Sequence, residues 1–262
     1  MEIIGFALAI LIGVSLGLIG SGGSILTIPI LVYVMHISPS DATTYSLFIV
    51  GISALVATIK GAQNKLLDYR IAFYFGLPSI VSILIMRSFL LPLLPDILFN
   101  ISGFVVTKDL FIMVVFAVLM IFASVSMIKR RKNVTSENHI VQTDKIIIKG
   151  IFVGLLTGFV GVGGGFLIIP AMVFSAKLPM KNAVATSLII IAANSLFGFA
   201  GSENSMTIDW KFLLDFAAFA IVGIFIGMGL SKKINNDKLK PAFGWFVLVT
   251  GIYILTKEIF LF

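Results

Sequence analysis

The chain has 262 residues, of which 59% are hydrophobic and 12% are charged, and its formal net charge is +7. Soluble domains carry about 25% charged residues, so this composition excludes an ordinary soluble protein. The lack of cysteine excludes disulfide bridges and thiolate metal sites.

Apolar stretches of spanning or near-spanning length follow one another along the chain. They cover residues 3–35, 42–59, 71–95, 110–128, 146–176, 182–200, 212–230 and 242–256. A membrane β-barrel would instead show roughly ten-residue segments of alternating polarity, which the sequence lacks. We therefore predict an all-α, polytopic helical membrane protein of the cytoplasmic membrane.

The first stretch contains the segment GLIGSGGSILTIP, residues 17–29, whose glycines and proline disfavour a continuous helix. We expect the chain to turn back here near the bilayer midplane as a re-entrant hairpin, because irregular backbone at that depth must be packed in protein or line a cavity. A short second helix follows and ends near Met35. Since proline favours a first helical turn, this helix is expected to begin either at Ser24 or as late as Pro29.

Polar side chains in the next two predicted helices are candidates for roles inside the membrane. Thr43 is expected to bond its own backbone one turn back, the usual role of an intramembrane hydroxyl, whereas Ser46 can reach the hairpin tip. Arg87 is a charge within an apolar run. It is predicted either to snorkel to the outer interface or to form an outer vestibule with Asp215, near the outer start of a later helix.

A basic linker, KRRKNVTSENHIVQTDK, separates two halves that repeat each other. A shift of 141 residues superposes the first glycine segment on GFVGVGGGFLIIP, residues 158–170. The same shift superposes Asp68 on Asp209, and both are predicted to be helix N-caps. The predicted organisation is one membrane domain with repeat 1 over 1–128, a cytoplasmic linker over 129–145 and repeat 2 over 146–262.

The charges of the loops distinguish between two possible topologies. If every stretch spans the membrane the halves are parallel, whereas with re-entrant hairpins three crossings remain per half and the second half is inverted. The hairpin arrangement places 60–70, 129–149, 177–181 and 231–240 together in the cytoplasm, where they hold 15 Lys and Arg against 4 Asp and Glu; the rest of the chain holds 4 basic and 8 acidic residues. Basic loops favour the cytoplasmic side, so we predict inverted repeats with residues 36–40 and both termini outside.

The two hairpin tips form the predicted substrate site. Each tip places a helix N-terminus, with free N–H groups and the positive end of the helix dipole, where an anion would be attracted, so no buried lysine or arginine is needed. Pro29 and Pro170 are the predicted hinges of the half-helices. The predicted substrate-binding residues are Ser21, Gly22, Gly23, Ser24, Ser46, Gly163, Gly164, Gly165, Ser187 and Asn194.

Two polar residues of the second half carry further expectations. Asn194 is expected to face the interior, because an unpaired amide is costly in lipid, and a role in lining a cavity is an open alternative there. Ser195 is expected to bond its own backbone. Catalytic chemistry is not expected, since His36 and His139 are the only histidines and lie apart. We expect no enzyme activity, no metal site and no cofactor.

Both glycine segments follow the pattern G-x-x-G-x-G-G-[SG]-x-L-x-x-P, and each opens one half of an eight-segment chain with a basic central linker. In this the whole chain resembles the TauE/SafE family of sulfite exporters. The resemblance implies an exporter of small sulfur-containing or organic anions such as sulfite, sulfoacetate or thiosulfate. It places the family function on Gly20, Gly22, Gly23, Pro29, Gly161, Gly163, Gly164 and Pro170.

The leading hypothesis is a secondary anion transporter that works by alternating access around a midplane site between inverted repeats. Its expected partners are a small anionic substrate and the lipid bilayer, with a homodimer as a candidate assembly and no nucleic acid. The alternative hypothesis is a membrane-embedded scaffold or assembly subunit, in which the glycine segments serve only for close packing.

Overall fold

The computed structural model describes residues 2–20, 22–63, 65–101, 104–128, 143–175, 178, 180–202, 208–231 and 236–260. Ser21 and most of the predicted linker lie outside these residues. The elements are α1 (Glu2–Ile19), α2 (Gly22–Pro29), η1 (Ile30–Val34), α3 (Pro39–Gln63), α4 (Tyr69–Ile85), η2 (Met86–Leu90), α5 (Leu91–Leu93), β1 (Ile97–Ile101), β2 (Phe104–Thr107), α6 (Lys108–Ile128), α7 (Thr143–Val160), α8 (Gly165–Ser175), α9 (Met180–Ala200), α10 (Trp210–Ser231) and α11 (Asn236–Phe260).

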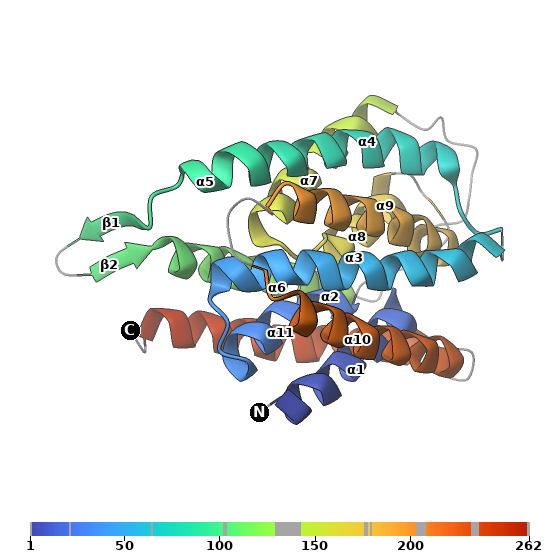
Figure 1. Ribbon diagram of the computed structural model, residues 1–262. Coiled ribbons are helices and arrows are strands. Elements are labelled where there is room, and N and C mark those ends of the chain that lie inside the picture. The colour runs from blue at the N-terminus through green and yellow to red at the C-terminus, as the bar shows by residue number, and fades with distance from the viewer. Residues whose placement is uncertain are drawn as a thin grey trace.

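Helices dominate the described chain and lie side by side in one bundle (Figure 1), which confirms the predicted all-α membrane class. Within the described residues, six helical segments are long and apolar enough to cross a membrane, three from each half. They are 39–59, 69–93 and 108–128 in the first half, and 182–200, 210–231 and 241–259 in the second. The antiparallel ribbon of β1 and β2 was not predicted, and it projects from one end of the bundle.

Both predicted glycine breaks are present. The first lies between α1 and α2, and the second between α7 and α8. The α-carbon of Gly23 packs against the backbone of Ile12 and the side chain of Leu16, so α2 lies back against α1.

The expectation that the second helix begins as late as the proline is wrong. Pro29 is the last residue of α2, and Pro170 lies inside α8. The physical reason is that glycine also adopts helical backbone angles. A run of glycines therefore ends a helix only at those glycines that have a positive φ. A wider π-turn, η1, follows Pro29.

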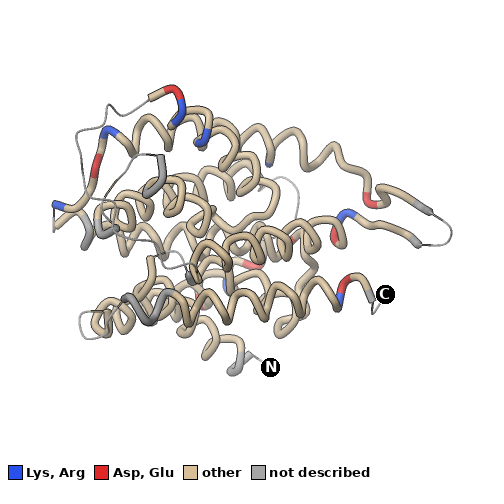
Figure 2. Tube along the Cα trace, turned by 180° about the vertical axis from the view of Figure 1, so that it is seen from behind, with Lys and Arg blue, Asp and Glu red and all other residues tan. Residues whose placement is uncertain are grey.

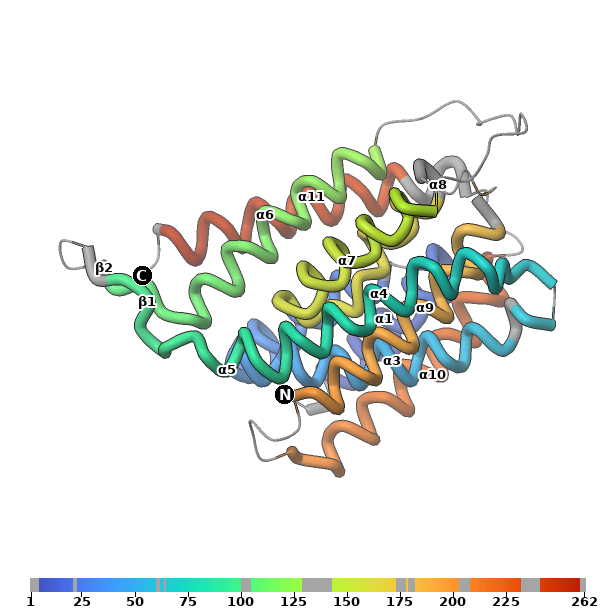
Figure 3. Tube along the Cα trace, turned by 90° about the horizontal axis from the view of Figure 1, so that it is seen from above, coloured from blue at the N-terminus to red at the C-terminus, as the bar shows by residue number. Residues whose placement is uncertain are grey.

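Charged residues gather near the two ends of the bundle and leave the middle of the helices mostly uncharged (Figure 2). Both termini and the β1–β2 ribbon lie at one end, and the turn between α3 and α4 lies at the other (Figure 3). These are the two groups of segments that the loop charges assign to opposite sides of a membrane.

The outward faces of the helices are apolar, as expected for contact with lipid. Phe122 is 70% exposed and Phe152 is 62% exposed. The interior instead holds many fully buried hydroxyl side chains, among them Thr43, Ser46 and Ser195. Polar groups are therefore kept away from lipid and placed between helices, where they can meet one another or a ligand.

The two predicted N-caps are confirmed. The backbone amide of each N-cap residue also donates a hydrogen bond to a side chain of the other half. Asp68 accepts a hydrogen bond from the Ile71 amide at 3.0 Å, and Asp209 accepts one from the Phe212 amide at 3.1 Å. The Asp68 amide donates to Thr186 of the other half at 2.9 Å. The Asp209 amide donates to Tyr45 at 3.0 Å, and Tyr45 is the residue equivalent to Thr186 at the 141-residue shift.

The close packing of helices also consists of equivalent contacts from each half to the other. The α-carbon of Gly13 in α1 lies against the carbonyl of Ala220 in α10, and that of Gly154 in α7 lies against the carbonyl of Ser79 in α4. The two pairs are equivalent at the 141-residue shift. Each half thus packs the first helix of its broken pair against a spanning helix of the other half, so neither half buries its core alone.

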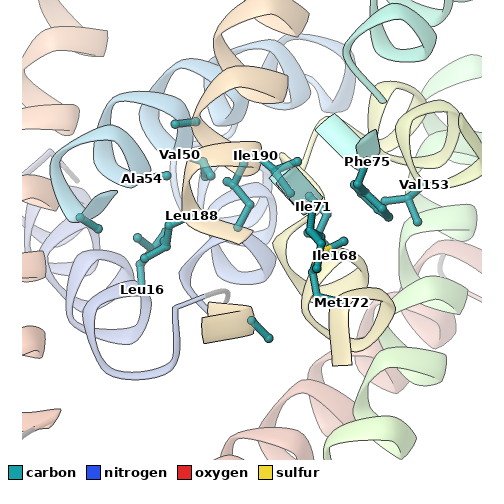
Figure 4. Packing of buried hydrophobic residues seen from close by; sticks show 14 of the residues in the cluster. Leu16, Val50, Ala54, Ile71, Phe75, Val153, Ile168, Met172, Leu188 and Ile190 are labelled. Atoms are coloured by element: carbon teal, nitrogen blue, oxygen red, sulfur yellow. The ribbon is translucent and has the colours of Figure 1, made fainter. Parts of the chain in front are cut away.

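One hydrophobic cluster joins the halves at the centre. Leu16 and Val50 come from the first half, and Ile168, Leu188 and Ile190 come from the second (Figure 4). The cluster lies beside both breaks, because Leu16 precedes the first break and Ile168 follows the second.

The helical glycines support packing, and this role predicts a stability effect. In Gly154→Ala the new β-carbon would overlap the Ser79 carbonyl. Overpacking costs about 1–3 kcal/mol, so we expect a clearly lower unfolding temperature in detergent. Gly229→Ala is the control, because nothing lies within 4 Å of its β-carbon position and alanine favours a helix. Equal unfolding temperatures for the two variants would contradict the α7–α4 contact.

Candidate functional site

The second helix break is the centre of the candidate site. Gly161, Gly163 and Gly164 have φ angles of 76°, 66° and 75°, a conformation that residues with a β-carbon rarely adopt. The Gly161 amide donates to the Thr157 carbonyl at 2.8 Å and closes α7. The first hydrogen bonds of α8 run to the Gly164 carbonyl, so the amides at the start of α8 have no partner within the helix.

Arg87 lies directly against this break. Its side chain is 1% exposed, and its Nη2 lies so close to Gly161 that a β-carbon there would overlap it. Nη1 donates to the Thr43 hydroxyl at 3.1 Å and to the Thr44 hydroxyl at 3.5 Å. Nε and Nη2 have no hydrogen-bond partner. None of the described carboxylates pairs with this cation.

The structure therefore overturns two expectations about Arg87. It does not snorkel to the outer interface, and it does not pair with Asp215, which is exposed on α10. The physical reason is that the side chain of Arg87 projects from the buried face of its helix. Arg87 lies in η2, four residues after Ile83 on the buried face of α4, and the π-turn continues that buried face.

One unpartnered hydroxyl lies against the same break, and a second lies one helical turn from Thr43. Ser195 of α9 lies against Gly163, and its Oγ has no partner. Ser46 lies on α3 one turn beyond Thr43, and its Oγ has no partner either. All of these side chains are fully buried. Ser195 was expected to bond its own backbone and does not, whereas Thr43 does, since it donates to the Ser40 carbonyl at 2.7 Å.

A buried cation with empty donors is unusual. Removing an ion from water costs several kcal/mol, which is normally offset by a counter-ion or by hydrogen bonds. Of the three guanidinium nitrogens of Arg87, only Nη1 has hydrogen-bond partners, and these are two threonine hydroxyls. The site is positive, desolvated and rich in donors, so it can bind a small anion.

The first helix break is different. Its positive-φ glycine, Gly20, lies against the apolar side chain of Val184. Gly22 and Gly23 are already helical, although their equivalents Gly163 and Gly164 are not. Ser24 is buried beside them. The first break therefore brings no described charged group to its tip, and the sequence signal of two equal glycine segments did not reveal this difference.

The remaining predicted site residues have local or interhelical partners. Ser187 donates to the Val184 carbonyl at 2.8 Å, which is the ordinary backbone bond of a helical hydroxyl. Asn194 is fully buried, as predicted, and its Nδ2 donates to Ser79 at 2.6 Å, joining α9 to α4. Gly164 lies against Thr157 of its own hairpin, so a larger residue there would disturb the hairpin rather than a ligand.

A surface pocket of about 290 Å³ lies one helical turn from the site, at the end of the bundle that carries the β1–β2 ribbon. Its lining residues are Ser40, Asp96, Ile97, Thr107, Lys108 and Asp109. Ser40 connects it to Arg87, because the Ser40 carbonyl accepts the hydrogen bond of Thr43. On its other side the Ser40 amide donates to Asp109 at 3.1 Å.

Known proteins similar to this chain are named as probable membrane transporter proteins. A probable membrane transporter protein of Xylella fastidiosa is 27% identical over 255 residues, which cover 95% of this chain and 92% of that protein. The probable membrane transporter protein YunE of Bacillus subtilis is 25% identical, with 97% and 99% covered. A probable membrane transporter protein of Methanocaldococcus jannaschii is 24% identical, with 95% and 94% covered. No solved structure matches the chain.

The family match extends over both helix breaks and Arg87. The family model of the sulfite exporter TauE/SafE matches residues 5–254. With its spanning helices and its named relatives, the chain is a multi-pass integral membrane protein and a transporter rather than an enzyme. The protein belongs to the sulfite exporter TauE/SafE family.

Proposed function

We propose that the protein is a secondary transporter of small oxygen-containing anions such as sulfite or an organosulfonate, and that it binds them at the second helix break. The observation that carries the proposal is the fully buried Arg87, whose Nε and Nη2 have no partner. The unpartnered hydroxyl of Ser195 and the first amides of α8 add neutral donors at the same break. Ser46, one helical turn from Thr43, has a further unpartnered hydroxyl.

The enclosure of the site supports alternating access as the transport mechanism. Arg87, Thr43, Ser46 and Ser195 are each at most 1% exposed, so an ion reaches them only after the protein moves. The reciprocal contacts between the halves support a two-fold arrangement of repeats. Asp68 starts α4 at one end of the bundle, and its equivalent Asp209 starts α10 at the other, which favours an inverted arrangement.

Sulfite is the substrate class that the family description names, and a desolvated cation with free donors is consistent with a small anion of this kind. One cation stands in the site without a carboxylate, so a single anionic group balances its charge. The pocket at Ser40 and Lys108 lies at the end predicted to lie outside, and Ser40 accepts the hydrogen bond of Thr43 beside the site.

Flux of radiolabelled sulfite across proteoliposomes that contain the purified protein tests the proposal. We expect uptake that saturates with sulfite concentration and exceeds that of protein-free liposomes at least tenfold. A scaffold or assembly subunit would give the protein-free rate for sulfite, methanesulfonate and acetate alike, and that result would overturn the proposed function.

The proposed orientation is tested by single cysteines in this cysteine-free chain. Ser38 and Gln63 are exposed; Ser38 directly precedes α3, and Gln63 is its last residue. We expect an impermeant thiol reagent to label Ser38→Cys in intact cells, and Gln63→Cys only after the membrane is opened. Labelling of Gln63→Cys from outside in intact cells would contradict the proposed topology.

A further inference from the structure

We propose that Arg87 makes the transporter specific for anions that carry at least two oxygens on one centre, and that each chain holds one such anion. The proposal rests on the anion site proposed above, and it adds what the site recognises and how many ions it holds. Monatomic anions such as chloride are the class that the site rejects.

Only one edge of the Arg87 guanidinium is free. Nη1 donates to the hydroxyls of Thr43 and Thr44, whereas Nε and Nη2 have no partner. Nε–H and one N–H of Nη2 are parallel and lie on the same edge of this planar group. Two parallel donors match two oxygens of one carboxylate, sulfite or sulfonate group. A monatomic ion meets both N–H groups only through bent hydrogen bonds, which are weaker.

The surrounding residues fix which edge is free. Thr43 accepts from Nη1 at 3.1 Å and donates to the Ser40 carbonyl at 2.7 Å, so its hydroxyl is committed in both directions. Gly161 packs against Nη2, and only a residue without a β-carbon leaves room for it. The donor pair is therefore held in place before an anion binds. Thr43 is a positioning residue, because it acts on the anion through Arg87.

The equivalent positions of the other half lack this donor pair, although the surrounding fold occurs twice. Apolar residues stand at the equivalent positions of the other half: Val184 for Thr43, Ala185 for Thr44 and Met228 for Arg87. The contact of Gly20 with Val184 repeats the geometry of the second break without its polar groups. The two repeats therefore form a single anion site, which lies at the second helix break.

Competition for sulfite uptake measures the proposed specificity. In proteoliposomes with the unaltered protein, we expect methanesulfonate to inhibit uptake of radiolabelled sulfite at a concentration at least tenfold lower than chloride. Arg87→Lys keeps the charge but lacks the parallel donors, so the ratio of the two inhibitory concentrations is expected to fall at least fivefold. Met228→Leu, at the equivalent position of the other half, is the matched control and leaves the ratio unchanged.

Thr43→Val gives a second variant if Arg87→Lys is not recovered folded. It is expected to raise the inhibitory concentration of methanesulfonate severalfold and to leave that of chloride unchanged. Equilibrium dialysis with radiolabelled sulfite is expected to give one bound ion per chain. The proposal is overturned if chloride inhibits as well as methanesulfonate, if neither variant changes the ratio, or if two ions bind. No sulfite uptake by the unaltered protein would instead overturn the proposed function.

Discussion

Arg87→Gln is expected to lower sulfite transport at least a hundredfold. Arg87 is the one described cation at the second break, and its two free nitrogens are the charged donors of the site. Hydrogen bonds to charged groups contribute about 1.5–3 kcal/mol each, and loss of two of them corresponds to about a hundredfold or more in affinity. Initial rates of radiolabelled sulfite uptake, compared at equal amounts of reconstituted protein, measure the effect.

The expected pattern separates a binding role from a structural one. Glutamine is neutral and removes a buried charge with empty donors, so Arg87→Gln is expected to keep or raise the unfolding temperature. Arg70→Gln makes the same change on an exposed residue of α4 and is expected to transport normally. Normal sulfite transport by Arg87→Gln would show that the anion binds elsewhere and that Arg87 only packs the break.

Apolar length and the glycine segments predicted most of the fold, because a membrane makes spanning length an explicit constraint. The breaks, the spanning helices and the N-caps Asp68 and Asp209 all appear where the pattern put them. The β1–β2 ribbon was missed because its residues, 97–107, form only a short run beside a helix end. A two-stranded ribbon has too few residues to give a clear alternating signal.

The candidate site was predicted only in part. The glycine pattern located the second break, but it gave the two breaks equal weight. Their difference depends on which side chains of other helices face them, and sequence spacing does not supply that. Arg87 was singled out as an intramembrane charge, but it was assigned to the outer interface or an outer vestibule instead of to the break. Its signal was available, because Arg87 continues the buried face that contains Ser79 and Ile83, and an intramembrane charge is by default a functional candidate.

Gly161→Ala is expected to reduce sulfite transport at least tenfold by moving Arg87. The φ angle of Gly161 is 76°, which costs an alanine about 1–2 kcal/mol, and the new β-carbon would overlap both Nη2 of Arg87 and the Thr43 side chain. Arg87 and Thr43 would both shift. Transport kinetics and the unfolding temperature are to be measured together, because backbone strain at residue 161 also lowers the unfolding temperature.

Gly76→Ala is the matched control for Gly161→Ala. Gly76 is also buried, but a β-carbon there would meet Ile190 at an ordinary 3.6 Å, and α4 is helical at this point. We expect Gly76→Ala to transport normally, because it changes a buried glycine without touching the break. If Gly161→Ala is folded and transports sulfite as fast as Gly76→Ala, the position of Arg87 against the break has no role in transport. If Gly161→Ala binds sulfite more weakly at an unfolding temperature only a few degrees lower, the break itself holds the guanidinium where the anion needs it.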